Sequence, residues 1–327
     1  MKIRVGFIGG GGIATRHISN LMACDDVTLV GVADPMLERA EAAAARFGGH
    51  AYAHHEAMLD SQALDAVYIC VPPFAHGPLE AAALERGVPF FTEKPLALDY
   101  ATAQAIAAAL EAQGLITAVG YHWRYLDIVE RAQELVHRNP ARLALGYWLA
   151  MTPSAPWWRQ HAQSGGQMVE QTTHIFDLAR LLVGEVETVH AVGASTPRES
   201  FPGADICDVS VATLRFATGA VGTIASTCLL NWHHRIGLHL FCNAMVLEIA
   251  EHEIMIDVGR GRPVTPAQGD PFVREDRDFL DAVQGKANRI RVPYREALRT
   301  HRLATSAEQS LREGRLLHLG QGEEAHG

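Results

Sequence analysis

Lys94 is a residue whose type and position suit chemistry on a bound molecule. It follows a short apolar and aromatic run, Pro89-Phe90-Phe91-Thr92, and stands between Glu93 and Pro95. Such a run predicts a buried strand that delivers one charged amine to the edge of a sheet and then stops. A lysine after a strand is usually a solvated loop residue, so the surrounding pattern must decide between the two readings.

His174 belongs to a second polar pattern, with Glu170 four residues before it and Asp177 three residues after it. The segment from Ser164 to Gly184 predicts one helix, opened by glycines and closed by a glycine. On a continuous helix these three residues share one polar stripe. A histidine paired with an acid one turn earlier is held in one tautomer and made more basic. An ordinary wet helix face gives the same pattern, and both readings are open.

The two side chains together suit the oxidation of an alcohol. At neutral pH a free histidine is largely unprotonated and a free lysine is charged. His174 would then be the base, and Lys94 the cation that stabilises the developing alkoxide. Burial of the amine would swap or share these roles, and the sequence leaves both divisions open.

A glycine-rich turn near the start of the chain predicts a dinucleotide site. A strand over residues 3–8 leads into Gly9-Gly10-Gly11-Gly12-Ile13-Ala14, and a helix continues through residue 22. The turn fits G-x-G-x-x-[G/A]. Its first two glycines permit a tight turn and a close approach of backbone N–H groups to a pyrophosphate. The predicted contacts are Gly9, Gly11, Gly12 and Ile13.

Asp34 ends the next predicted strand, Thr28 to Ala33, at the spacing where an acid accepts hydrogen bonds from the adenosine ribose. A carboxylate there repels a 2′-phosphate, so NAD is favoured over NADP. Arg39 in the following helix keeps NADP open. The structural alternative for Asp34 is a helix N-cap before Pro35.

The elements that position these residues alternate between strand and helix over the first half of the chain. We predict strands over 66–71, 88–92 and 116–120 and helices over 76–86 and 100–113, which indicates a doubly wound parallel α/β sheet. Ligands bind such sheets beyond the carboxyl ends of the strands. The residues predicted at that edge are Val71, Pro72, Pro73, His76, Glu93, Lys94 and Tyr121 to Arg124. His76 also fits a helix residue without a ligand, and Arg124 fits an ion-pair partner or a substrate contact.

The pattern changes after Tyr125. A strand over 143–151, alternating stretches over 186–194, 207–216, 220–229, 236–242 and 245–249, and helices over 272–284 and 295–313 predict a large, mostly antiparallel open sheet. Residues 320–327 are predicted to be a frayed tail. An open sheet with few helices has a face that must be covered, which predicts a homodimer or homotetramer through this sheet.

Composition narrows the class of protein. The 327 residues carry a formal net charge of -9 and no Lys/Arg-rich block, which argues against nucleic acid as the main partner. No apolar run reaches membrane-spanning length, and the apolar start is too short for a signal peptide. Five widely spaced cysteines without a C-x-x-C pair favour reduced thiols in the cytoplasm, with Cys70 as a core residue. His233, His234 and His239 lack acids or thiols at ligand spacing, so no metal site is expected.

These motifs, in this order, resemble the glucose-fructose oxidoreductase, inositol dehydrogenase and rhizopine-catabolism family, abbreviated Gfo/Idh/MocA. The resemblance implies a Rossmann domain over residues 1–122 and a C-terminal α+β domain over 123–327 for substrate binding and oligomerisation. It implies an NAD(P)-dependent dehydrogenase or reductase that acts on a sugar, polyol or related carbonyl compound. The matching residues run along nearly the whole chain: Gly6 to Gly11, Val71 to Pro73 with His76, Glu93 to Pro95, Val119 to Tyr121 with Arg124, Trp158-Arg159, Gly165-Gly166, His174 with Asp177, and Phe279 to Val283.

The resemblance also implies that Lys94 is the family's catalytic lysine and His174 the histidine of its substrate-domain helix. Many polyol dehydrogenases of the family carry an aspartate where this chain has Glu170, whose longer side chain would orient His174 differently or contact the substrate. Aromatic rings and polar groups suit a sugar, whose C–H face packs on aromatics. The predicted substrate residues are Tyr121, Arg124, Trp157, Trp158, Arg159, Gln167 and Asp177, with Trp123 as a further candidate wall or a packing residue.

Two alternatives share the same resemblance. One is a non-catalytic regulator that senses a dinucleotide, although the presence of both Lys94 and His174 weighs against it. The other is an NAD-dependent glycoside hydrolase, which oxidises a sugar transiently and eliminates its aglycone.

Overall fold

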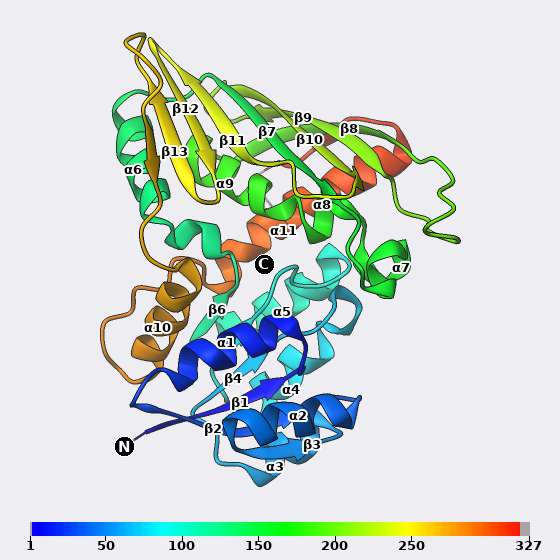
Figure 1. Ribbon diagram of the computed structural model, residues 1–327, viewed down its shortest axis with the longest axis vertical. Helices are drawn as coiled ribbons and strands as arrows, with labels where there is room; N and C mark the ends of the chain where they lie inside the picture. The colour runs from blue at the N-terminus through cyan, green and yellow to red at the C-terminus, as the bar shows by residue number, and fades with distance from the viewer. Residues whose placement is uncertain (1, 321–327) are drawn as a thin grey trace. The chain divides into compact units, whose positions relative to one another are not determined.

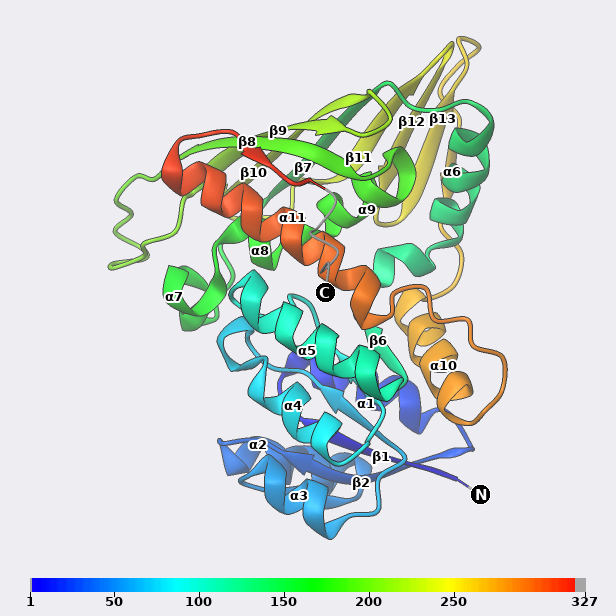
Figure 2. The same cartoon turned by 180° about the vertical axis from the view of Figure 1, so that it is seen from behind.

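The computed structural model of the chain describes residues 2–320, which form two compact units. The first unit contains residues 2–125 and 270–298, and the second contains residues 126–269 and 299–320. Each unit is built on its own sheet (Figures 1 and 2). The predicted frayed tail lies, from residue 321 onward, outside the described residues.

The first unit contains a six-stranded parallel sheet in the order β3-β2-β1-β4-β5-β6. The order reverses between β1 and β4, which is the switch point of a doubly wound fold and confirms the predicted class. The three-residue β3 was not predicted, so the strand before Lys94 is the fifth along the chain and not the fourth. The strands are β1 (Ile3–Ile8), β2 (Val27–Ala33), β3 (His50–Tyr52), β4 (Ala66–Ile69), β5 (Phe90–Thr92) and β6 (Thr117–Val119).

Helices cover both faces of this sheet, because successive strand side chains point to opposite faces. In β5, Phe90 packs with α3, α4 and α5, whereas Phe91 packs with α1, α2 and α10. Both rings are fully buried. The helices are α1 (Gly12–Met22), α2 (Leu37–Phe47), α3 (His55–Ser61), α4 (Pro78–Glu85), α5 (Tyr100–Gln113) and α10 (Pro271–Val283), with 3-10 turns η1 (Pro73–Ala75) and η2 (His122–Tyr125).

Residues 270–298 follow residues 126–269 of the second unit in sequence but pack within the first unit. Phe279 and Leu280 of α10 lie in the same apolar cluster as β1 and α1. Further along, the Val292 carbonyl accepts a hydrogen bond from the Val119 N–H of β6 at 3.0 Å. Apolar burial and a backbone hydrogen bond thus hold this late segment beside β1 and β6.

The helix predicted from His76 begins two residues later. Gly77 precedes α4 with a φ of 103°, and Pro78 occupies the first helical position. The Glu80 side chain accepts the Gly77 N–H at 2.6 Å and so satisfies a donor at the helix start. His76 therefore lies in the link between η1 and α4.

The second unit contains a nine-stranded sheet in the order β14-β13-β12-β11-β7-β10-β9-β8-β15. Its pairs are antiparallel except β7 with β10, which confirms the predicted mostly antiparallel sheet. The strands are β7 (Leu143–Met151), β8 (Val186–Ala194), β9 (Val209–Phe216), β10 (Val221–Leu230), β11 (Arg235–Cys242), β12 (Met245–Ala250), β13 (Glu253–Asp257), β14 (Val264–Pro266) and β15 (Leu317–His318).

Helices of the second unit lie on one face of this sheet (Figures 1 and 2). A Cβ on Gly146 of β7 would lie 2.6 Å from Ile175 of α9, so this glycine lets helix and sheet approach closely. The helices are α6 (Asp127–Arg138), α7 (His161–Ser164), α8 (Gln167–Glu170) and α9 (Thr173–Val183), with the 3-10 turn η3 (Pro156–Arg159). A further helix, α11 (Tyr294–Glu313), begins in residues of the first unit and continues in the second from residue 299. Among residues 2–320, no helix combines the length and apolarity needed to cross a bilayer.

The single helix predicted from Ser164 to Gly184 is wrong, because α8 and α9 are separated at Gln171 and Thr172. The Thr172 N–H bonds to the Gln167 carbonyl at 3.0 Å, five residues back, and its hydroxyl lies 2.7 Å from Ser226 of β10. This anchoring to the sheet interrupts the helical ladder. Glu170 and His174 consequently belong to different helices and do not share a polar stripe.

Candidate active site

The glycine turn after β1 has the geometry that its spacing predicts. Gly9 adopts a φ of 96°, and a Cβ there would lie 2.2 Å from the Cys70 carbonyl oxygen, so only glycine fits. A Cβ on Gly11 or Gly12 would meet nothing within 4 Å. The start of α1 therefore faces open space, without an acidic residue in its first turn, and fits a pyrophosphate. Ala14 is buried and lets α1 pack against the sheet.

Asp34 braces this turn. One carboxylate oxygen accepts the Gly10 N–H at 2.8 Å, and the other accepts the Met36 N–H at 2.8 Å. The helix N-cap reading is wrong, because α2 begins at Leu37 with Met36 at the cap. A carboxylate oxygen can accept more than one hydrogen bond, so Asp34 has capacity left for a ribose hydroxyl. Arg39 is exposed beside Gly10, at the position that kept NADP open.

Three of the segments predicted at the carboxyl edge of the first sheet leave the sheet there. Strand register aligns Ile8 with Ile69, and Ile69 with Thr92. Gly9 and Lys94 therefore leave the same edge from strands two positions apart, which is roughly 10 Å. The Val71-Pro72-Pro73 exit from β4 lies between them, with Val71 and Pro72 partly exposed.

His76 lies behind the proline turn. Its Nδ1 is 2.6 Å from Glu80, and its Nε2 is 3.2 Å from the Val71 carbonyl oxygen. Burial favours the neutral form of Glu80, but His76 and hydrogen bonds from Thr92 and Gly77 outweigh it and lower the Glu80 pKa. This network gives His76 a role in holding the Val71 exit, beside its predicted cofactor contact.

Lys94 is partly exposed at the end of β5, and its peptide bond to Pro95 is cis. The adjacent Glu93 is buried and turned inward. One Glu93 oxygen lies 3.0 Å from His17 of α1, and the other accepts the Lys94 backbone N–H at 3.2 Å. Sequence reasoning missed His17; the signal was a histidine among Ala14, Ile18 and Leu21 on the apolar stripe of α1.

His122 is a second ionisable residue near Lys94. Burial first, and then the positive charges of Lys94, His17 and Arg16, lower the pKa of His122 to about 3. Its ring stacks on Phe272 with centroids 4.2 Å apart. The imidazole of His122 is therefore neutral at neutral pH.

The predicted substrate residues on η2 and just before it are buried within the first unit. Tyr121 lies in the apolar cluster of β5 and β6, and Trp123 is also buried. Arg124 donates to Glu296 at 3.0 Å, which confirms the ion-pair reading of this residue.

His174 lies in the first turn of α9, in the second unit. Its ring is buried and stacks on Trp148 of β7, with centroids 5.8 Å apart and an angle of 18° between the planes. Trp148 was not predicted; the alternation of β7 places it on the helix-covered face with Gly146. The sheet thus fixes the plane of the His174 ring.

Glu170 bonds to a tryptophan. The indole N–H of Trp158 donates to a Glu170 carboxylate oxygen at 2.5 Å. Glu170 lies at the end of α8 and His174 in the first turn of α9, so the predicted single helix does not join them. Trp158 itself is buried with Ile206 and Cys228.

The other predicted substrate residues of the second unit differ in exposure. Trp157 and Arg159 are partly exposed on η3, and the Arg159 guanidinium lies over the Phe201 ring at 5.1 Å. Gln167 is buried and donates to Gln171 and to the Thr227 carbonyl. Asp177 is buried and accepts the Thr300 hydroxyl at 2.7 Å.

A cavity of about 700 Å³ opens on the opposite face of the second sheet. It is lined by Tyr147, His239 and Glu248, among others. Tyr147 and Trp148 are neighbours on one strand and point to opposite faces. The cavity is therefore separated by the sheet from His174.

Two family models match the chain. Residues 3–121 match a model described as an oxidoreductase family with an NAD-binding Rossmann fold, and residues 141–248 match the GFO/IDH/MocA C-terminal domain.

All five cysteines are free thiols, and Cys70 is buried in the core as predicted.

Named relatives extend the match. The chain is 30% identical over 227 residues to myo-inositol 2-dehydrogenase of Thermotoga maritima, covering 68% of this chain and 67% of that protein. It is 26% identical over 334 residues to inositol 2-dehydrogenase of Rhizobium meliloti, covering 98% and 100%. A solved levoglucosan dehydrogenase in complex with NADH shares the fold, with a TM-score of 0.87, 21% identity and coverage of 98% and 100%.

Proposed function

The chain belongs to the Gfo/Idh/MocA oxidoreductase family, and on this premise we propose that it transfers a hydride between NAD and a hydroxyl-bearing carbon of a sugar or polyol. The observation that carries the proposal is the common sheet edge of the glycine turn and Lys94. That arrangement supports a role for the Lys94 amine beside a dinucleotide bound at the same edge. Bound NAD supplies the hydride acceptor.

The chain's own residues handle the charge and the proton. Lys94 stabilises the oxygen as it develops negative charge, and His174 accepts the hydroxyl proton. Stacking on Trp148 supports the role of His174, because it restricts ring rotation. In the reverse direction His174 returns the proton to the oxygen, while Lys94 stabilises the negative charge that develops there.

The proposed cofactor contacts lie in the first unit. Gly11 and Gly12 leave room for the pyrophosphate, and Asp34 takes the ribose, which favours NAD over NADP. The remaining proposed contacts are Gly9, Ile13, Val71, Pro72, Pro73, His76, Glu93 and Lys94.

The proposed substrate is polyhydroxylated, in keeping with relatives named inositol and levoglucosan dehydrogenases. Glu170 accepts the Trp158 indole N–H and so holds this ring in place beside the proposed substrate. The remaining proposed substrate residues are Tyr121, Arg124, Trp157, Arg159, Gln167 and Asp177.

We also propose a homo-oligomer formed through the outer face of the second sheet, and a cytoplasmic location. Exposed apolar side chains on four neighbouring strands support the oligomer: Leu145, Val192, Val211, Val221 and Leu229. Free thiols support the location.

A substrate panel tests the proposal. Purified protein with NAD is offered myo-inositol, scyllo-inositol, levoglucosan and common aldoses, and absorbance at the NADH band is followed. We expect NADH formation with at least one polyhydroxylated compound. Tight NAD binding without NADH formation from any of them would favour a dinucleotide-sensing regulator. Release of nitrophenol from aryl glycosides without net NADH would favour a glycoside hydrolase.

A further inference from the structure

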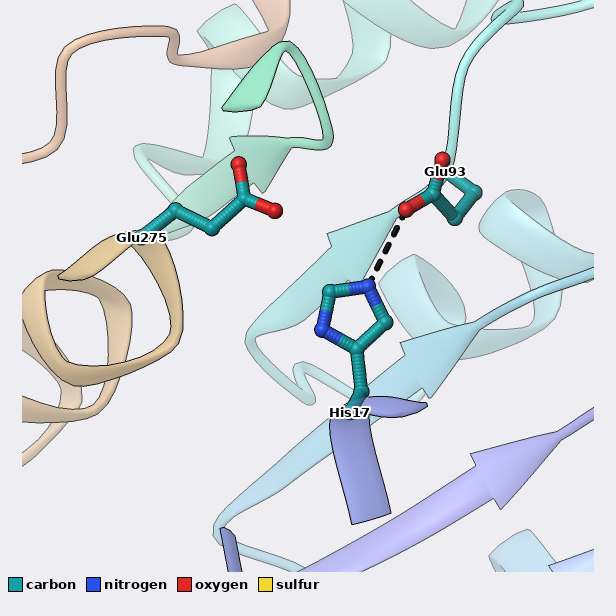
Figure 3. A group of neighbouring side chains, drawn as sticks. All are labelled: His17, Glu93 and Glu275. Atoms are coloured by element: carbon teal, nitrogen blue, oxygen red, sulfur yellow. Dashed lines mark hydrogen bonds and ion pairs between the residues drawn. The ribbon is translucent and has the colours of Figure 1, made fainter. Parts of the chain in front are cut away.

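A buried charge network lies directly behind Lys94. His17 of α1 points at Glu93, which follows β5, while Glu275 approaches from α10 (Figure 3). The Nδ1 atom of His17 is 2.7 Å from Asp276 Oδ1, and its Nε2 atom is 3.0 Å from Glu93 Oε1. His17 has 0% of its surface exposed. Because each ring nitrogen faces a carboxylate oxygen, an imidazolium with two N–H donors satisfies both.

Glu93 connects His17 to the backbone of Lys94. One carboxylate oxygen faces His17, and the other accepts the Lys94 backbone N–H at 3.2 Å. A Cβ on Gly120 would lie 2.6 Å from the same carboxylate, so the glycine after β6 makes room for it. The Glu93 carboxylate thus joins α1 to the residue that carries the proposed reactive amine.

We propose that His17 is a positioning residue for Lys94: its imidazolium, held between Asp276 and Glu93, fixes the Glu93 carboxylate and thereby the backbone from which the Lys94 amine projects. The inference rests on the proposed function, because it gives a reason for holding Lys94 rigidly. Catalysis requires such precision, since a displacement of about 1 Å at a reacting group can cost roughly a hundredfold in rate.

The charges around His17 agree with this role. Burial lowers the pKa of His17, but Asp276 and Glu93 outweigh burial and raise that pKa well above the ordinary histidine value. Asn20 donates to the far oxygen of Asp276 at 3.0 Å and holds the outer end of the network. The other titratable or charged groups around the network are Arg16, Tyr68, Cys70, Lys94, His122, Asp270 and Glu275.

Glu275 lies beside this network. It is fully buried, and within residues 2–320 neither of its carboxyl oxygens has a hydrogen-bond partner. Burial raises the pKa of Glu275 well above its ordinary value, against the opposing charge of His17. Burial therefore favours the neutral form of Glu275.

A metal ion is the competing explanation. Ligand atoms of His17, Glu93 and Glu275 lie within 4.8 Å of one another, and Asp276 would orient the ring as an outer-sphere acid. A metal on Nε2 would have to replace the proton that His17 shares with Glu93. The 3.0 Å separation between these two atoms is a hydrogen-bond distance, which favours the proton.

The first measurement uses the intact protein. Histidine labelled with ¹⁵N is incorporated, and His17 is assigned by its loss in His17→Gln or, if that variant does not fold, in His17→Asn. We expect both ring nitrogens of His17 to carry protons at neutral pH and to keep them above the ordinary histidine range. A neutral ring at neutral pH would overturn the proposal, as would a stoichiometric metal whose removal by a chelator abolishes activity.

The second measurement is kinetic, on His17→Gln and His17→Ala. We expect kcat to fall by up to roughly a hundredfold, the cost of displacing a reacting group by about 1 Å, while the Kd for NAD changes little. Imidazole added to His17→Ala should restore part of kcat. Ile18→Ala, which removes apolar packing from the next position of α1, should lower the Tm without this loss of kcat and without rescue.

The outcomes separate this inference from the proposed function. If Lys94→Ala keeps the wild-type turnover, the result would contradict the proposed function itself. Turnover that is lost in Lys94→Ala but kept at the wild-type kcat in His17→Gln would overturn only the role of His17. A fall in kcat that Ile18→Ala reproduces at equal Tm, with no rescue by imidazole, would also overturn it.

Discussion

At the scale of residues, Glu170 makes a contact that the sequence pattern did not indicate. Its carboxylate accepts a hydrogen bond from the Trp158 indole N–H. Trp158 is buried, so loss of this acceptor would strand a polar N–H away from water. The bond depends on the reach of glutamate from α8.

We predict that Glu170→Asp is destabilising, because the shorter side chain does not reach Trp158. The free energy of unfolding in urea should fall by about 1–3 kcal/mol, the cost of an unsatisfied buried donor. Glu170→Gln is the matched control, since its carbonyl oxygen still accepts from the indole. An aspartate variant as stable as wild type, or a glutamine variant as unstable as aspartate, would contradict this assignment.

His122 gives a prediction for pH. Unfolded, it titrates near the ordinary value of 6.5, whereas in the folded chain its pKa is about 3. Between these values the unfolded state binds the extra proton, so the His122 contribution destabilises the fold progressively as pH falls from 6.5 toward 3. In urea titrations across this window, the free energy of unfolding should fall less steeply with decreasing pH in His122→Gln than in wild type. His252→Gln, at an exposed site, should keep the wild-type slope; equal slopes for all three proteins would refute the assignment.

At the scale of elements, two glycines of the turn after β1 serve different purposes, one in folding and one in ligand binding. Gly9 combines a φ of 96° with contact against the Cys70 carbonyl, while Gly11 has an ordinary φ of -78° and open space around it. The first glycine is therefore required by the fold, and the second only by a ligand.

We predict opposite outcomes for the two alanine variants. Gly9→Ala should lose at least about 1–3 kcal/mol of unfolding free energy through backbone strain, with a further loss from the contact with the Cys70 carbonyl. Gly11→Ala should unfold like wild type but bind NAD more weakly, because its methyl group occupies the space for the pyrophosphate. Urea unfolding and fluorescence titration with NAD measure the two effects. A normal NAD affinity in Gly11→Ala would contradict the assignment of the pyrophosphate to this position.

The elements also show where sequence patterns suffice. Local signals predicted β1, β7, α5 and α11 to within a residue or so, because apolar periodicity and flanking turn residues mark them. The break between α8 and α9 carries no such signal: it depends on Thr172 bonding to Ser226 of a strand more than 50 positions later. Likewise, the link from His17 to Asp276 spans 259 positions, so only the fold reveals it.

At the scale of the whole chain, composition and motif order predicted the family, the parallel and antiparallel sheets and the NAD-binding class. They did not indicate that residues 270–298 return to the first unit, because the apolar stripe of α10 does not specify which sheet it covers. The same limit applies to the outer face of the second sheet, where exposed valines and leucines show a surface but not its occupant.

We predict that a charge on this outer face separates the proposed oligomer. Val211→Lys places an ammonium group in the middle of β9, where burial against a second copy would be costly. Sedimentation should show wild type above the monomer mass and the variant at the monomer mass. Val273→Lys, at an exposed valine of α10, should leave the mass unchanged. A monomeric wild type, or an unchanged mass in Val211→Lys, would contradict the interface.

The most direct test of the catalytic proposal is the rate of NADH formation in a single turnover of Lys94→Ala. The chain has only two other lysines, and Lys286, which pairs with Asp26 and Asp281, supplies the control Lys286→Ala. With NAD binding intact, we expect the Lys94 variant to form NADH about 10²–10⁴-fold more slowly than wild type, and the Lys286 variant to match wild type. A Lys94→Ala enzyme that transfers the hydride at the wild-type rate would contradict the account.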